Sequence, residues 1–155
     1  GGSAQTRMMR QVAGRLKLDL ATYREYRAFA KFASDLDAET RRILARGDRM
    51  TEILKQEQYV PMPVERQVIA TFAGTRGYWD KVRPEAITAI EAQLFGFLDQ
   101  RYPQIEQQLR DRQELSDELA EQLSVAIAEF VQQLEVSQLL EAETGKNPVE
   151  DDVTG

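Results

Sequence analysis

Residues 116–134 read SDELAEQLSVAIAEFVQQL, and their apolar side chains recur every three or four positions. That spacing places one stripe of side chains on a single face of an α-helix: Leu119, Leu123, Ile127, Phe130 and Leu134. Ser116 stands immediately before the stripe, where its hydroxyl can accept a hydrogen bond from a free backbone N–H of the first turn. The stretch therefore predicts a capped amphipathic helix with a buried apolar face.

The same helical period runs through the chain upstream, and no stretch of four or more residues alternates between apolar and polar in the way a hairpin strand does. Six further helices are expected: one with Met8, Met9 and Val12 that weakens at Gly14, one capped by Asp19, one capped by Asp37, one with Pro63 in its first turn, one from Pro84 and one from Pro103. Gly47 lies on the apolar stripe of the third of these seven helices. There it either lets a neighbouring helix approach closely or weakens its own helix.

These segments predict an all-α fold, a bundle of about seven short-to-medium helices joined by short turns. The chain has 155 residues, of which 42% are apolar, and this is the size of one ordinary domain. We expect residues 1–140 to form that domain. The apolar pattern stops after Leu140, and residues 135–155 hold six acidic residues against one lysine. Residues 141–155 are therefore expected to be a disordered acidic tail.

Composition excludes several kinds of function. The net charge of −6 argues against a basic nucleic-acid groove, so no nucleic-acid partner is expected. The absence of Cys and His removes thiol nucleophiles, Ser-His triads and zinc sites, and no glycine-rich phosphate-binding motif is present. No apolar run approaches the roughly 20 residues that span a bilayer, so direct membrane insertion is not expected. The chain opens Gly1-Gly2-Ser3 without Met, as a processed product or an excerpt of a longer chain would.

The segment KQEQYVPMP at 55–63 is the clearest predicted loop, because Pro61 and Pro63 force the residues before them toward extended conformations. In an extended segment Gln56 and Gln58 project to opposite sides of the backbone, so a ligand edge between them needs a curved loop. Each glutamine amide offers a donor and an acceptor side by side, which matches the edge of adenine. A solvated polar turn is the alternative interpretation of this segment.

Other polar features have structural interpretations that we favour over functional ones. Asp35, Asp37, Asp117 and Glu118 resemble paired acids, yet they stand at expected helix starts, where carboxylates stabilise free N–H groups. Arg76, between Gly74 and Gly77, could clamp an anion, but we expect it to cover the end of its helix. Two further sets are assigned to a solvated basic face (Arg7, Arg10, Arg15 and Lys17) and to core anchors (Tyr78 and Trp79).

An ordered series of residue strings resembles the alpha subunit of the F-type ATP synthases. The strings are GGSAQT at 1–6, QVAG at 11–14, LDLA at 18–21, YRE at 23–25, SDLD at 34–37, LKQEQY at 54–59, PMPVE at 61–65, AGTRGY at 73–78 and LSDEL at 115–119. They follow one another over about residues 1–134 with little shift in spacing. Each string is moderately specific, and their order is highly specific to the C-terminal helical domain of that subunit.

The resemblance implies a role that the residues alone do not give. In the family, the residues that fall on Gln56 and Gln58 flank the adenine of ATP or ADP at the non-catalytic, regulatory site. The phosphate-binding loop, the arginine finger and the residues that hold Mg²⁺ lie upstream and are absent from this chain. The domain would therefore be no enzyme by itself, while catalytic sites lie mainly on the beta subunits of the ring.

The resemblance also implies an assembly and a location. The implied partners are beta subunits and the central-stalk gamma subunit, in a complex peripheral to an energy-transducing membrane, on the cytoplasmic face in a bacterium. The implied process is proton-driven ATP synthesis, although Gly14-Arg15-Leu16 and residues 39–42 are also similar to a sodium-linked branch.

The chain departs from the family at a few positions. Glu57 stands where the family often has Pro, Arg66 replaces a common Glu, and Trp79 replaces a common Leu. The Glu57 substitution is expected to loosen the loop and to add an anion near the base. The alternative to the ATP synthase role is a stand-alone helical interaction module, derived from that domain and without a nucleotide role.

Overall fold

The computed structural model describes residues 2–32 and 35–134, with side chains from Arg7 onward. Its elements are α1 (Gly2–Ala30), α2 (Ala38–Tyr59), α3 (Val64–Thr75), the 3₁₀ helix η1 (Pro84–Ala86), α4 (Ile87–Arg101), α5 (Pro103–Arg112) and α6 (Asp117–Gln133). No strand occurs in these two ranges, which confirms the all-α prediction. The predicted tail at 141–155 lies outside the described residues.

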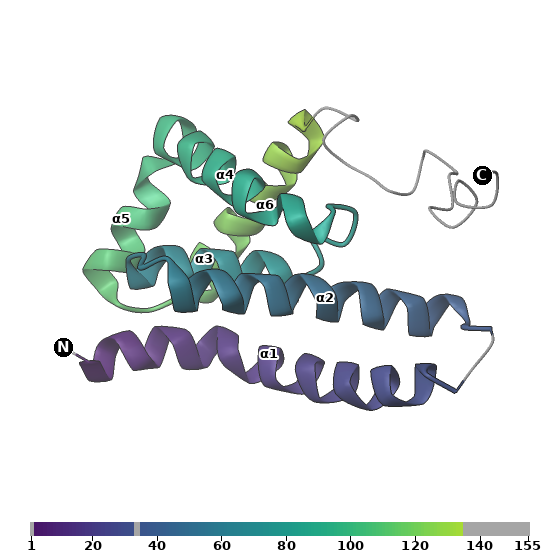
Figure 1. Cartoon of the computed structure of the whole chain (residues 1–155). Coiled ribbons are helices and arrows are strands. Elements are labelled where there is room, and N and C mark those ends of the chain that lie inside the picture. The colour runs from purple at the N-terminus through teal and green to yellow at the C-terminus, as the bar shows by residue number, and fades with distance from the viewer. Residues whose placement is uncertain (1, 33–34, 135–155) are drawn as a thin grey trace.

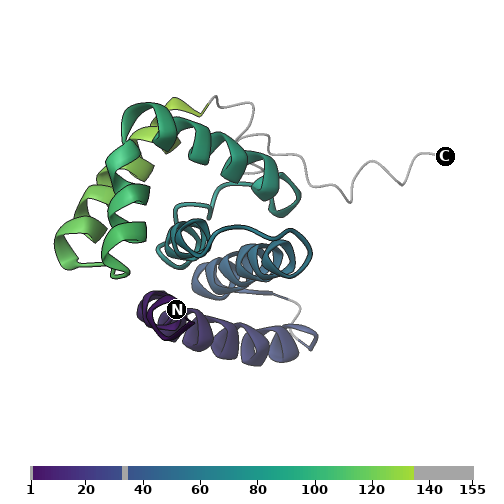
Figure 2. The same ribbon diagram turned by 90° about the vertical axis from the view of Figure 1, so that its left-hand side faces the viewer.

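The helices form two groups (Figures 1 and 2). α1 and α2 are an antiparallel hairpin, and α3 packs against both of them. α4, α5 and α6 follow one another around the other side of α2 and α3. The core lies between the groups and draws buried apolar side chains from every α-helix.

The first predicted helix boundary is wrong, because α1 continues through Gly14 and Asp19 as one helix. Met8, Val12, Leu16 and Tyr23 are all buried along one face, so a single stripe spans both predicted helices. Gly14 is exposed with open space around its Cα, and an exposed glycine costs a helix only about 1 kcal/mol. Burial of the stripe outweighs this cost, and Asp19 is an interior residue rather than an N-cap.

The loop prediction for 55–63 is wrong for its first half, because α2 continues through Tyr59. Val60 follows in an extended conformation (φ −121°, ψ 102°), and its N–H bonds to the carbonyl of Gln56 at 2.8 Å. Pro61 disfavours the helical conformation only for the residue immediately before it, which is Val60. The helix can therefore reach Tyr59 unhindered.

The predicted caps and proline starts agree with the structure in most places. Asp37 accepts a hydrogen bond from the Thr40 N–H at 2.7 Å and begins α2, and Ser116 accepts one from the Leu119 N–H at 3.1 Å and begins α6. Among the other starts, Pro103 begins α5, Pro84 begins the 3₁₀ turn before α4, and Pro63 immediately precedes α3.

Gly47 lets two helices approach closely, as one of the two sequence interpretations proposed. A Cβ placed on Gly47 would overlap the ring of Tyr23, which fits against α2 at this point. The Tyr23 hydroxyl donates to Asp48 Oδ1 at 2.7 Å and accepts from Arg27 Nη1 at 3.2 Å. The hairpin of α1 and α2 is therefore fixed at a site that only glycine allows.

No helix in the described part of the chain is both long enough and apolar enough to cross a membrane.

Candidate functional site

The two glutamines singled out from the sequence lie in the last turn of α2. Gln56 is half-buried and Gln58 is exposed. Residues two apart on a helix point about 200° away from each other, so the two amides face different sides of the helix end. The structure therefore places them on one turn but does not bring them to one face.

The chain that follows Gln58 is exposed and largely apolar. Tyr59 and Val60 are 76% and 51% exposed, and Pro61 is also exposed. The return to α3 is held by the Gln67 side chain, whose amide donates to the Met62 carbonyl at 3.1 Å. A ring and a branched side chain beside a free amide can pack on a flat heterocycle and bond its edge.

The electrostatics of this helix end disfavour a phosphate. The C-terminus of a helix carries a partial negative charge, and the last turn of α2 has no basic residue but does contain Glu57. An uncharged base fits this end better than the anionic part of a nucleotide. The described surface beside Gln58 therefore favours an uncharged group over an anion.

Glu57 points inward and bonds to α3. Its Oε1 accepts a hydrogen bond at 3.1 Å from the hydroxyl of Thr71, a residue with no exposed surface. Burial raises the pKa of Glu57, and the Thr71 hydroxyl opposes that rise by stabilising the charged form. The predicted loosening of the segment by Glu57 is not what the structure shows, because this side chain ties α2 to α3.

Glu91 of α4 is a buried carboxylate near Glu57. It is 3% exposed, and its Oε1 has no hydrogen-bond partner among the described residues. Burial first, and then the charge of Glu57, raises the pKa of Glu91 from its usual 4.5 to about 7. Glu91 shows no sequence signal, because it stands singly on a helix whose other polar residues are exposed.

The acidic residues at helix starts are structural, as expected for most of them. Asp37 caps α2, and its hydrogen bonds with Thr40 lower its pKa. Asp117 and Glu118 lie exposed in the first turn of α6, beside the Ser116 cap. Asp35 is exposed and caps no helix in the described residues. Within residues 2–32 and 35–134, no group of three or more acidic residues could hold a metal ion.

Arg76 covers the end of α3, although in a different way from the one predicted. Its guanidinium lies 4.5 Å from the centroid of the Phe72 ring, and its backbone N–H bonds to the Phe72 carbonyl. The side chain thus stacks on an aromatic ring and does not bond the last carbonyls. Gly77 follows with a positive φ of 83°, which glycine adopts without strain.

Tyr78 and Trp79 are core anchors, as predicted. Trp79 is 1% exposed and meets Phe130 edge to face at 6.2 Å between ring centroids, and the Tyr78 hydroxyl donates to the Ser124 carbonyl. The predicted basic face of α1 is exposed at all four positions. Of these four residues, Arg7 pairs with Glu114 at 3.2 Å.

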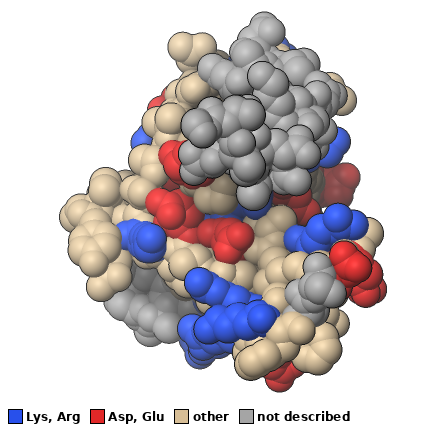
Figure 3. All heavy atoms as spheres, turned by 45° about the vertical axis from the view of Figure 1, so that its right-hand side comes forward, with Lys and Arg blue, Asp and Glu red and all other residues tan. Residues whose placement is uncertain are grey.

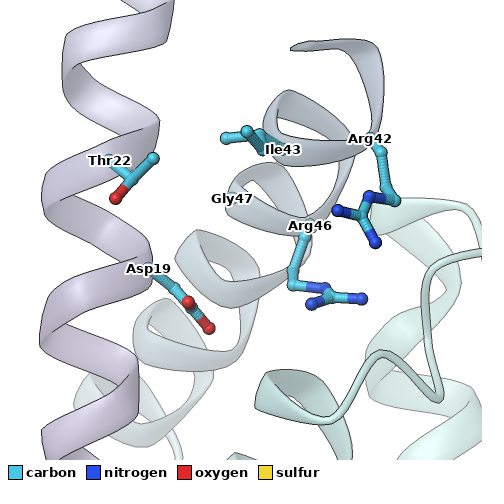
Figure 4. Close-up of a pocket in the computed structure, with 6 residues that line it drawn as sticks. All are labelled: Asp19, Thr22, Arg42, Ile43, Arg46 and Gly47. Carbon is cyan, nitrogen blue, oxygen red and sulfur yellow. The ribbon is translucent and has the colours of Figure 1, made fainter. Parts of the chain in front are cut away.

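A small cavity of about 150 Å³ lies between α1 and α2 (Figure 4). Asp19 and Thr22 of α1 face Arg42 and Arg46 of α2 across it. Arg46 is committed to Asp80 through two hydrogen bonds of 3.2 and 2.7 Å. Arg46 is thus already paired, and Asp19 Oδ2 is a buried carboxylate oxygen without a hydrogen-bond partner in the described chain. The cavity is therefore a poor site for an anion.

Charges of both signs meet on the surface of the body. On the face drawn in Figure 3, blue and red side chains lie next to one another, and neither sign covers the visible part of that face.

Comparison with known proteins identifies the class to which these helices belong. The family described as "ATP synthase alpha/beta chain, C terminal domain" matches residues 5–130. The chain therefore belongs to this family of helical C-terminal domains.

Its relatives are of the alpha type. ATP synthase subunit alpha of Wolinella succinogenes is 52% identical over 130 residues, and that of a Sulfurovum species is 48% identical over 130 residues. In both cases the alignment covers 84% of this chain and 26% of the relative. The chain thus corresponds to the C-terminal domain of an ATP synthase alpha subunit and spans about a quarter of the length of these relatives.

Proposed function

We propose that this domain supplies the adenine-binding wall of a non-catalytic, regulatory nucleotide site in a full-length ATP synthase alpha subunit. The observation that carries the proposal is the last turn of α2, where exposed Gln58 and half-buried Gln56 flank a helix end that also exposes Tyr59 and Val60. A glutamine amide can bond the paired donor and acceptor of adenine, and the adjacent ring can pack on its face. ATP or ADP would reach Mg²⁺ and its phosphate contacts through upstream residues.

The domain would act within an assembly and would do no chemistry itself. Beta subunits beside it and the gamma subunit of the central stalk are the proposed partners, in a complex peripheral to an energy-transducing membrane and on its cytoplasmic face in a bacterium. The complex would couple ATP synthesis to protons or sodium ions. Phe29 and Phe32, 71% and 90% exposed at the end of α1, support a protein contact at that end of the hairpin.

The test uses the full-length alpha subunit with Gln56→Ala, Gln58→Ala and the double substitution. Each lost hydrogen bond should weaken ATP at the non-catalytic site by up to roughly tenfold and reduce the preference for ATP over GTP. Gln93→Ala, on the exposed surface of α4, is the matched control and should change neither. Equilibrium binding measures affinity, and thermal melts check the fold. Unchanged affinity and unchanged base preference in the double variant would exclude these glutamines from the site.

A stand-alone interaction module without a nucleotide role is the second candidate, favoured by exposed Phe29 in α1 and exposed Phe32 in the turn that follows it. The coding sequence upstream separates the two. An in-frame phosphate-binding loop supports the subunit, whereas a start codon close to Gly1 supports the module.

A further inference from the structure

Thr71 of α3 uses its hydroxyl differently from three other threonines of the chain. The hydroxyls of Thr22, Thr51 and Thr75 each donate to the carbonyl four residues earlier on their own helix, a common arrangement for threonine in a helix. Thr71 has no exposed surface, and its hydroxyl donates instead to Oε1 of Glu57 in α2 at 3.1 Å. This hydroxyl therefore joins two helices.

The bond between Thr71 and Glu57 lies where water competes little, because Thr71 is fully buried and Glu57 is half-buried. A hydroxyl that donates to a carboxylate makes a charge-assisted bond, and the exclusion of water strengthens it. A valine at position 71 would have nearly the same shape but no donor, so the carboxylate would lose its bond in a place that water reaches poorly. The bond therefore opposes movement of Glu57 away from α3.

Glu57 belongs to the last turn of α2, where a helix is most easily frayed because its final carbonyls lack partners within the helix. Successive residues of a helix point about 100° apart. With Glu57 directed at α3, Gln56 and Gln58 therefore project to either side of that contact. A rotation or fraying of the turn would move both amides, so the bond to Thr71 fixes where they point.

We propose that Glu57 and Thr71 are positioning residues that set the base specificity of the adenine-binding wall by holding the last turn of α2 against α3. The inference rests on the proposed function above, because that function assigns Gln56 and Gln58 to adenine. In this role neither Glu57 nor Thr71 contacts the nucleotide, and both act through the placement of the two amides. An amide recognises a base only when its donor and acceptor face the edge of that base, so a loosened turn weakens adenine binding and reduces discrimination against guanine.

The test compares ATP and GTP binding at the non-catalytic site of the full-length alpha subunit in wild type, Thr71→Val and Thr71→Ser. Thr71→Val removes the donor and should weaken ATP binding by roughly threefold, as expected for a turn that keeps its binding geometry about a third of the time. GTP binding should weaken less, so the preference for ATP falls. Thr71→Ser keeps the hydroxyl and should restore both values. Thr51→Val, which removes a hydroxyl bonded within α2 itself, is the matched control and should change neither.

Binding in the double variant with Gln56→Ala and Gln58→Ala shows whether Thr71 acts through the glutamines. Thr71→Val should have no further effect on ATP affinity in that background. A full additional threefold loss there, or unchanged affinity and base preference in Thr71→Val alone, would overturn the positioning role while the glutamines keep theirs. If the double variant itself binds as wild type does, the proposed adenine site fails, and the positioning role fails with it.

Hydrogen exchange on the nucleotide-free full-length subunit locates the effect. The amides of residues 57–60 should exchange several-fold faster in Thr71→Val than in wild type and Thr71→Ser, and equal rates in all three would overturn the proposal. Thermal melts check the fold. Should Thr71→Val fail to fold, Glu57→Ala removes the other half of the bond and should show the same losses of affinity and base preference. Unchanged binding in that variant would overturn the proposal equally.

Discussion

Carboxylates withdrawn from solvent occur in two places among the described helices, and arginines pair with them in only one of these places. At the start of α3, Glu65 and Glu106 are 6% and 8% exposed, and arginines bind them: Arg66 reaches Glu106 at 3.1 Å, and Arg110 reaches Glu65 at 3.2 Å. Glu57, in the last turn of α2, and Glu91, in α4, pair with no cation among the described residues.

The difference shows that carboxylates buried to a similar extent, such as Glu65 and Glu91, can differ in whether a cation balances them. An arginine cannot lose its proton in the physiological range, so a positive charge faces Glu65 and Glu106 throughout that range. Glu91 has no such partner, and burial raises its pKa to about 7, so its charge changes near neutral pH. Glu65 and Glu106 thus keep a balancing charge beside them, whereas the charge of Glu91 depends on pH.

The strongest test of this contrast is a Glu→Gln substitution made at one buried carboxylate of each kind, Glu91 and Glu106. Glu91→Gln should stabilise the chain at pH 8 by about 3 kcal/mol, because a pKa raised from 4.5 to about 7 lowers stability by about 1.4 kcal/mol per unit once the acid is ionised. Glu106→Gln should destabilise it by about 2 kcal/mol, because Arg66 and Arg110 lose a carboxylate. Urea unfolding at pH 8 gives both values. If both substitutions changed the free energy of unfolding in the same direction, the two carboxylates would not differ in the way described.

Arg66→Met should cost about 2 kcal/mol at every pH from 5.5 to 8.5. The substitution keeps an apolar stem but leaves Glu106 with only the longer contact to Arg110, at 3.4 Å, and removes the guanidinium from over the Phe95 ring, 4.9 Å away. Asp99→Asn, which weakens only the exposed contact of Arg66, serves as the control and should cost under about 0.5 kcal/mol. A loss that varies strongly with pH would show that this cluster also titrates.

Arg110→Ala should cost about 1 kcal/mol in the same urea assay. Its side chain is 56% exposed, which weakens its pairs, although it binds the largely buried carboxylate of Glu65. Addition of 0.5 M salt should leave most of this loss in place, because the Glu65 end of the pair is shielded from ions. Complete loss of the effect in salt would place Arg110 among ordinary surface charges.

Arg7→Ala gives the smallest expected effect, about 0.3 kcal/mol, and marks the lower end of the scale. Arg7 and Glu114 pair at 3.2 Å with side chains 62% and 45% exposed, where water screens the charges. A loss above about 1 kcal/mol in urea unfolding would mean that this contact fastens α1 to the connection between α5 and α6 more firmly than its exposure implies.

Local signals allowed most of the fold to be predicted from the sequence. Asp37 and Ser116 cap their helices because a cap needs only its own side chain and the next few N–H groups. Asp19 has the same chemistry, but the apolar stripe from Met8 to Tyr23 continues past it, and tertiary burial outweighs a local preference. Residues 56–59 are helical because Pro61 restricts one preceding residue only, a reach that the prediction overstated.

The candidate site was less predictable than the fold. The glutamines were found through the spacing of a short motif and its resemblance to a family, although their helical setting was missed. Glu91 could not be found from the sequence, because its burial comes from helices distant along the chain, and a single Glu on an otherwise mixed helix gives no periodic signal.

The fit of Tyr23 against Gly47 has a mechanical consequence for the hairpin. To slide along α2, α1 would have to lift the ring out of the space that a missing Cβ leaves and break the bond of its hydroxyl with Asp48. The Tyr23 ring therefore opposes sliding of α1 along α2. A force applied near Phe29 and Phe32 would then act on both helices of the hairpin together. The hairpin is thereby held in one register by a single ring and a single missing Cβ.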